Sequence, residues 1–132
     1  MTSSAVRAVV AGHGDFAHGV ISAAAQITGR GEVFSGMSNR GLGPDEIERE
    51  LRTRLDESGA HVIFTDLPGG SATIAARRVL RDRPELVLVT GANLAVLLDF
   101  ACHEELGAGA AARHAADRGR ESLTVFGAPS AD

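Results

Sequence analysis

The feature that most constrains the fold is an alternation of short apolar runs with segments of helical periodicity. Every run except the last is followed by a turn rich in glycine or proline and then by apolar residues spaced three or four apart. This order favours a mainly parallel sheet with helices on both faces. We therefore predict an open α/β domain. The predicted strands are residues 6–11, 32–35, 61–67, 86–90 and 123–126.

The predicted helices lie between these runs. Asp15 and Ser71 are placed to cap two of them, and Pro44 suits the first turn of another. The run at 86–90 is apolar throughout, which is typical of a central strand. Residues 36–43 are predicted to form a loop. The helices are expected at about 16–28, 44–58, 71–83, 93–101 and 107–120.

The size and composition favour one globular domain with a net negative charge. A chain of 132 residues with 44% hydrophobic residues can bury one core, so we assign the domain to residues 1–127 and a tail to 128–132. The net charge of -4 argues against nucleic acid as a partner. A local basic patch stays possible, because four arginines cluster in one segment, although they could also form a solvated helix face: Arg77, Arg78, Arg81 and Arg83. We expect a cytoplasmic protein, because no signal peptide or membrane-spanning run is evident, and we expect Cys102 to fill the core.

His13 is the first candidate for chemistry. It lies between two glycines directly after the first predicted strand. The carboxyl ends of parallel strands gather at one edge of a sheet, which is where such proteins bind ligands. The loops 12–15, 66–71 and 91–93 should therefore converge there. A neutral imidazole in such a turn can act as a nucleophile, although it could also be a simple polar turn residue.

Asp66 and the turn after it complete the candidate site. A carboxylate bonded to one nitrogen of His13 would fix the ring tautomer and leave the other nitrogen free. Alternatively, Asp66 could only cap its own turn. The amides of Gly69 and Gly70 with the hydroxyl of Ser71, at a helix start, could form a phosphate cradle.

Other kinds of site fit the sequence less well. His13 and His18 have no cysteine or glutamate near them at a zinc-binding spacing, so no metal site is expected. The chain contains no lysine and therefore no Walker motif, and no cofactor is expected. A hydrolase built from Ser71, His13 and Asp66 would lack the usual Gly-x-Ser-x-Gly turn.

Three segments resemble the mannose-type enzyme IIA component of the bacterial phosphoenolpyruvate-dependent sugar phosphotransferase system (PTS). They are AGHGDFAHGVISAAAQITG, FTDLPGGSATIAARRVL and LVTGANLAVLLDF. The resemblance implies that His13 is phosphorylated, that Asp66 orients it, and that Gly69, Gly70 and Ser71 lie at the phosphate. It also implies a homodimer that exchanges an antiparallel last strand, here residues 123–126.

The resemblance further implies the partners. The small carrier HPr would donate the phosphoryl group, and a IIB component would accept it for sugar entering through membrane IIC and IID subunits. Phe16, Leu67 and Pro68 are candidates for the docking surface around His13. Two alternatives stay open: the phosphotransfer subunit of a dihydroxyacetone kinase, and a regulatory module switched by phosphorylation of His13.

Overall fold

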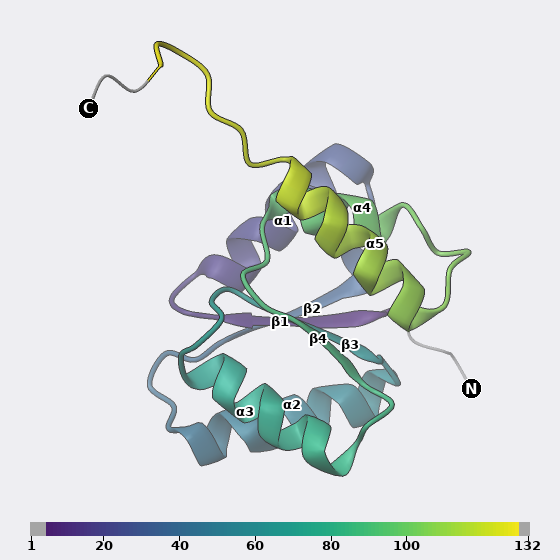
Figure 1. The fold of residues 1–132 in the computed structure, drawn as a ribbon. Coiled ribbons are helices and arrows are strands. Elements are labelled where there is room, and N and C mark those ends of the chain that lie inside the picture. The colour runs from purple at the N-terminus through teal and green to yellow at the C-terminus, as the bar shows by residue number, and fades with distance from the viewer. Residues whose placement is uncertain (1–4, 130–132) are drawn as a thin grey trace.

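A computed structural model describes residues 5–129 of the chain. It contains a four-stranded sheet in the order β2-β1-β3-β4, in which all neighbouring strands are parallel. Helices α1, α4 and α5 cover one face and α2 and α3 cover the other, so the predicted architecture is confirmed (Figure 1). The elements are β1 Ala8–Gly12, α1 Phe16–Thr28, the 3-10 turn η1 Gly31–Val33, β2 Phe34–Ser38, α2 Pro44–Ser58, β3 Val62–Thr65, α3 Ser71–Asp82, β4 Val87–Val89, α4 Leu94–Ala101 and α5 Ala108–Glu121.

The sheet separates two hydrophobic cores. Alternate residues of β1 point to opposite faces, which explains why this strand is apolar throughout. On one side, Phe34, Phe64 and Phe100 form an aromatic cluster with ring centroids 5.1–6.4 Å apart. On the other side, the fully buried leucines and isoleucine of α2 pack against the sheet. Both cores hold β1 and β3 rigidly in the middle of the domain.

The helix ends agree with the sequence in part. Gly29 and Gly59 end α1 and α2 in the left-handed conformation, and Pro44 begins α2 as predicted. Asp15 precedes α1, but its side chain makes no cap hydrogen bond. Ser71 is the first helical residue of α3 rather than its cap, because Gly70 occupies that position. Asp15 therefore occupies the predicted cap position without the side-chain bond, and the prediction that Ser71 caps α3 was wrong.

Strand β2 begins and ends later than predicted. Glu32 and Val33 belong to η1, and the strand continues through Gly36 into the segment expected to be a loop. A Cβ at Gly36 would lie 2.8 Å from Cδ1 of Ile21, so the absence of a side chain lets α1 pack directly on this strand. Contact with the helix, which the sequence pattern does not reveal, explains the glycine within β2.

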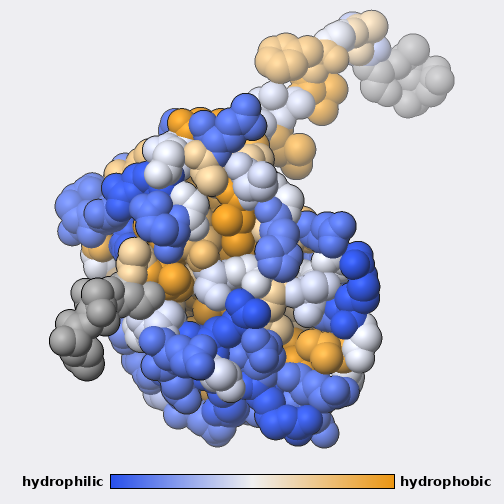
Figure 2. Space-filling view, turned by 180° about the vertical axis from the view of Figure 1, so that it is seen from behind, coloured by the Kyte–Doolittle hydropathy of each residue, from blue (hydrophilic) through white to orange (hydrophobic). Residues whose placement is uncertain are grey.

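The far edge of the sheet also differs from expectation. β4 lies at the edge, bonded only to β3 among the described strands, and its three residues are only partly buried. Residues 123–126 form no strand in this single chain. Leu123, Val125 and Phe126 are 85–96% exposed, and the segment projects from the body of the molecule as a hydrophobic tail (Figures 1 and 2). Part of the predicted tail, residues 130–132, lies outside the described residues, as do residues 1–4.

Two further sequence expectations concern the surface. Cys102 is exposed at the end of α4, so the prediction that it fills the core was wrong. Among the clustered arginines, Arg78 of α3 forms ion pairs with Asp45 and Glu48 of α2, and Arg83 pairs with Asp56, so these arginines belong to a mixed-charge surface. No helix within residues 5–129 is long and apolar enough to cross a membrane.

Candidate functional site

The structure brings His13 and Asp66 together at the carboxyl edge of the sheet. They follow β1 and β3, which are neighbouring parallel strands, so their chain positions end side by side. Nδ1 of His13 lies 2.8 Å from Oδ2 of Asp66, and the backbone amide of His13 donates to the same oxygen at 2.9 Å. This carboxylate thus holds both the ring and the main chain of His13.

These bonds set the charge and tautomer of the pair. Burial of Asp66 acts to raise the pKa of its carboxyl, but the hydrogen bonds from the amide and ring of His13 outweigh this and lower the pKa below its usual value. Asp66 is therefore an acceptor, and the ring nitrogen facing it carries a hydrogen. In the neutral ring, Nε2 then carries the lone pair, and the side chain is half exposed. This geometry is compatible with a nucleophilic role for Nε2.

Two glycines make the close approach possible. A Cβ at Gly12 would lie 2.9 Å from Cγ and Oδ2 of Asp66, so any side chain there would displace the carboxylate. Gly70 has φ of +90° and ψ of 170°, a conformation that essentially only glycine adopts. A Cβ there would lie 3.2 Å from Cε1 and 3.7 Å from Nε2 of His13. The exposed edge of the imidazole therefore faces the glycine turn.

The same turn opens α3. The amide of Ile74 makes the first helical bond, to the carbonyl of Gly70. The amides that precede it, at the N-terminus of α3, therefore have no acceptor within the helix. Ser71 lies among them, and its hydroxyl accepts a hydrogen bond from the side-chain amide of Asn39 at 2.9 Å, which leaves its own hydrogen available. Helix amides and a hydroxyl beside an exposed nucleophile suit an anionic phosphoryl group.

Two buried threonines fix the turn from below. The hydroxyls of Thr65 and Thr73 lie 2.7 Å apart, and that of Thr73 donates to the carbonyl of Leu67 at 2.6 Å. Both residues are at most 2% exposed. Since unpaired hydroxyls would be costly in this environment, the network stabilises one conformation of the loop between Asp66 and Ser71.

The loop after β2 also contributes to the site, which the sequence pattern did not indicate. The amide of Asn39 donates to the carbonyl of Gly12 at 3.0 Å, in addition to its side-chain bond with Ser71. Arg40 lies next to it, 3.4 Å from the carboxylate of Asp15, and a Cβ on Gly14 would be 3.4 Å from its guanidinium. A correct end for β2 at Ser38 would have placed this loop at the site, because it follows the strand next to β1.

The third loop predicted for the site serves another purpose. Oδ1 of Asn93 caps α4 by accepting from the amide of Val96 at 3.0 Å, and its amide donates to the carbonyl of Gly119 in α5 at 3.2 Å. The loop does lie at the same edge, since the amide of Ala92 donates to the carbonyl of Thr65. The side-chain hydrogen bonds of Asn93 therefore join α4 to α5.

Several apolar side chains near the glycine turn are exposed to solvent. Leu67 and Ile74 are 49% and 47% exposed, and Pro68 is exposed between Leu67 and the glycine turn. Phe16 is half-buried and packs into the core below Gly12, so it contributes less to this surface than expected. Ile74 was not singled out from sequence, although it lies one helical turn beyond Ser71 on α3.

Comparisons with known proteins agree on the fold. The structure resembles the mannose/sorbose specific IIA subunit of the phosphotransferase system from Enterococcus faecalis, with a TM-score of 0.79 and 20% identity over 96% of this chain and 98% of that one. Phosphotransferase system component EIIA from Streptococcus agalactiae has a TM-score of 0.83 and 17% sequence identity, over 92% of this chain and 97% of that one. The PTS IIA protein associated with the fucose utilization operon of Streptococcus pneumoniae has a TM-score of 0.73 and 23% sequence identity, over 95% of this chain and 96% of that one.

No curated protein matched the chain in a sequence search. The family of PTS system fructose IIA components, EIIA-man, matches residues 7–116. That range is most of the chain, and it includes His13, Asp66 and the glycine turn. The recognition made from the three sequence segments is therefore confirmed, and the protein belongs to the EIIA-man family of PTS IIA components.

Proposed function

We propose that the protein is a sugar-PTS phosphocarrier in which Nε2 of His13 receives and releases the phosphoryl group. The observation that carries this proposal is the 2.8 Å bond between Nδ1 of His13 and Oδ2 of Asp66. With the ring hydrogen on Nδ1 and donated to this carboxylate, the lone pair on Nε2 attacks phosphorus while the bond from phosphorus to the donor breaks. Transfer onward reverses these events with the next acceptor.

Each neighbouring group has a defined task in this proposal. The phosphorylated ring keeps its Nδ1 hydrogen and gains positive character, which the carboxylate of Asp66 stabilises. Gly70 gives the phosphoryl group access to Nε2, and the amides and hydroxyl at Ser71 bind its oxygens. Since these donors are already in place, little reorganisation accompanies transfer.

The partners proposed are HPr as donor and a IIB component as acceptor, with membrane IIC and IID subunits beyond it, all consistent with a cytoplasmic location. Leu67, Pro68 and Ile74 form the docking surface in this proposal, because they are exposed and apolar and flank the glycine turn in the chain. A partner resting on these residues could bring its own phosphoryl-bearing group to Nε2.

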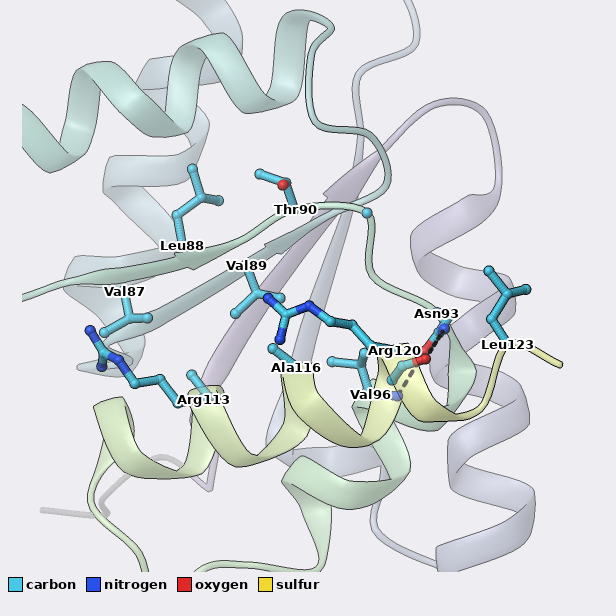
Figure 3. Close-up of a pocket in the computed structure, with 13 residues that line it drawn as sticks. Val87, Leu88, Val89, Thr90, Asn93, Val96, Arg113, Ala116, Arg120 and Leu123 are labelled. Carbon is cyan, nitrogen blue, oxygen red and sulfur yellow. Dashed lines mark hydrogen bonds between the residues drawn. The ribbon is translucent and has the colours of Figure 1, made fainter.

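We also propose that two copies exchange their C-terminal segments. A groove of about 470 Å³ follows β4 and is bordered by α5. In Figure 3, Val87 and Val89 point toward the side of α5 that carries Arg113 and Arg120, and Leu123 lies at the end near Asn93. Residues 123–126 of a second copy, pairing antiparallel with β4, would cover both the strand edge and their own exposed apolar side chains.

The decisive experiment is phosphotransfer in a purified system. Incubation with phosphoenolpyruvate, enzyme I and HPr should add one phosphoryl group, measured by intact mass, through a bond that is labile in acid and stable in base. His13→Ala should abolish the addition, whereas His18→Ala, at an exposed position of α1, should leave it intact. Unchanged labelling of the His13→Ala protein would overturn the proposal.

Acceptor assays then separate the roles left open by sequence. Transfer from phosphorylated His13 to a IIB component supports the transport role. Transfer to the other subunits of a dihydroxyacetone kinase would instead identify the kinase subunit. Phosphorylation that alters the affinity for a partner without onward transfer would identify the regulatory module.

A further inference from the structure

A second cluster of chemically active side chains lies between α4 and α5. Asp99 belongs to α4, His103 follows it by one helical turn, and His114 comes from α5. Nδ1 of His114 lies 2.6 Å from Oδ2 of Asp99, and Nδ1 of His103 lies 3.5 Å from the same oxygen. The two imidazole rings are in contact, with centroids 4.4 Å apart. The proposed phosphotransfer step uses none of these three residues.

We propose that Asp99, His103 and His114 bind one transition-metal ion of the zinc class. Each residue offers one ligand atom, and the three atoms all lie within 4.8 Å of one another. Tetrahedral zinc with bonds of about 2.0–2.1 Å to nitrogen and oxygen requires ligand atoms about 3.3 Å apart. The separation of 3.5 Å is close to this requirement, and the separation of 2.6 Å must open by less than about 1 Å. The ligand atoms of the two histidines lie at most 4.8 Å apart, so they must approach each other by no more than about 1.5 Å.

The donor set favours a first-row transition-metal ion over magnesium or calcium. Two imidazoles and one carboxylate suit zinc, cobalt or nickel, whereas magnesium and calcium prefer oxygen ligands. Asp99 is about 10% exposed, while His103 and His114 are 30% and 45% exposed. The carboxylate is therefore held in place by the fold, and the ion can enter from the solvent side. Three protein ligands leave one position for water.

Binding exchanges the existing hydrogen bonds without leaving a carbonyl unpaired. With the metal at Nδ1, each neutral ring keeps its one hydrogen on Nε2. His103 gives up its 2.7 Å bond to the carbonyl of Asp99, but this carbonyl also accepts from the amide of Cys102 at 3.1 Å. His114 exchanges its bond to the Asp99 carboxylate for a bridge through the ion.

The ion would connect two helices that are otherwise joined by packing and by Asn93. α5 precedes the exposed segment 123–126 and borders the groove along β4. Metal binding would thus fix the helix from which that segment leaves the domain. This consequence does not depend on phosphorylation of His13, and the two proposals can fail separately.

Untagged protein can be titrated with zinc in calorimetry and with cobalt in visible absorption. We expect one ion per chain, a cobalt spectrum of low coordination number, and a higher melting temperature with zinc. His114→Gln and His103→Gln should each weaken zinc binding by at least ~10–100-fold, the effect known for less direct changes at metal sites. His61→Gln alters an exposed histidine outside the cluster and should change nothing.

Histidine ring nitrogen chemical shifts test the proposal in the unaltered protein. Zinc should shift the signals of His103 and His114 and leave those of His13, His18 and His61 in place. Absence of saturable binding would overturn the proposal, as would binding that survives both glutamine substitutions or shifts centred on His13. Magnesium and calcium should produce neither the shifts nor the thermal stabilisation.

Discussion

Two regions of the molecule differ in how completely a single chain builds them. One is the carboxyl edge of the sheet, where His13 lies, and the other is the lateral edge formed by β4. At His13, the carboxylate of Asp66, the turn at Gly70 and the side chain of Asn39 are joined by hydrogen bonds and close contacts within the chain. Along β4, the strand is only partly buried, and the nearby segment 123–126 exposes its apolar side chains almost fully.

This difference separates chemistry from assembly. A single chain supplies every group proposed to act on the phosphoryl group, because those groups follow the two central strands. The outer strand lacks a neighbour, and an unpaired edge beside an apolar segment favours association. Damage at His13 should therefore change transfer without changing assembly, and damage to the C-terminal segment should do the reverse.

The largest effect is expected for Asp66→Asn. An amide can donate to Nδ1 of His13 and thereby move the ring hydrogen to Nε2, which blocks the nucleophile. Rapid-quench measurement of transfer from phosphorylated HPr should show a loss on the order of 10²–10⁴-fold. Asp82→Asn, which removes a surface partner of Arg52, should leave the rate unchanged. A rate within a few-fold of the original would remove Asp66 from its assigned role.

The second prediction concerns the other edge. Replacing Leu123, Val125 and Phe126 together by serine should weaken self-association by at least ~100-fold, since burial of one such side chain contributes about 1.5–3 kcal/mol. Light scattering over a concentration series measures the change, while the initial rate at His13 serves as the control and should be unaffected. A variant that associates as strongly as the original would show that the exchanged segment is not the interface.

These two edges also show what the sequence can predict. The apolar runs and glycine turns predicted the strand–helix order, and the places of His13 and Asp66 at two strand ends indicated that they would meet. Asn39 was missed because its role depends on the exact end of β2, and the strand continues through Gly36, where the sequence pattern predicts a loop. The edge position of β4 is a long-range property of strand order, which the apolar pattern does not specify. The exposure of Cys102 likewise depends on the turn after α4, which the apolar residues around it in the sequence do not specify.

A third prediction tests the geometry of the glycine turn. Gly70→Ala should destabilise the protein by about 1–3 kcal/mol, because its backbone conformation is strained for any residue with a Cβ. The new methyl group would also crowd Cε1 of His13 and slow transfer. Gly69→Ala is a matched control, since a Cβ there meets nothing within 4 Å. Equal melting temperatures for the two variants would contradict this account of Gly70.

The smallest effect concerns pH. The pKa of Asp66 in the folded protein lies below the ordinary value of 3.8, so its ionised form stabilises the fold above that pH, and this contribution is lost as the pH falls through the lowered pKa. The free energy of unfolding, measured with denaturant, should fall more steeply below pH 3.8 for the original protein than for Asp66→Asn. Parallel stability curves for the two proteins in this range would show that the pair contributes no such stabilisation.

The most direct test of the central claim is to identify which nitrogen of His13 carries the phosphoryl group. Long-range proton–nitrogen NMR of the protein, before and after phosphorylation, reports both the tautomer and the site of attachment. The hydrogen bond to Asp66 predicts a hydrogen on Nδ1 in the free protein and phosphorus on Nε2 in the product. Phosphorus on Nδ1, or a free ring with its hydrogen on Nε2, would contradict the account.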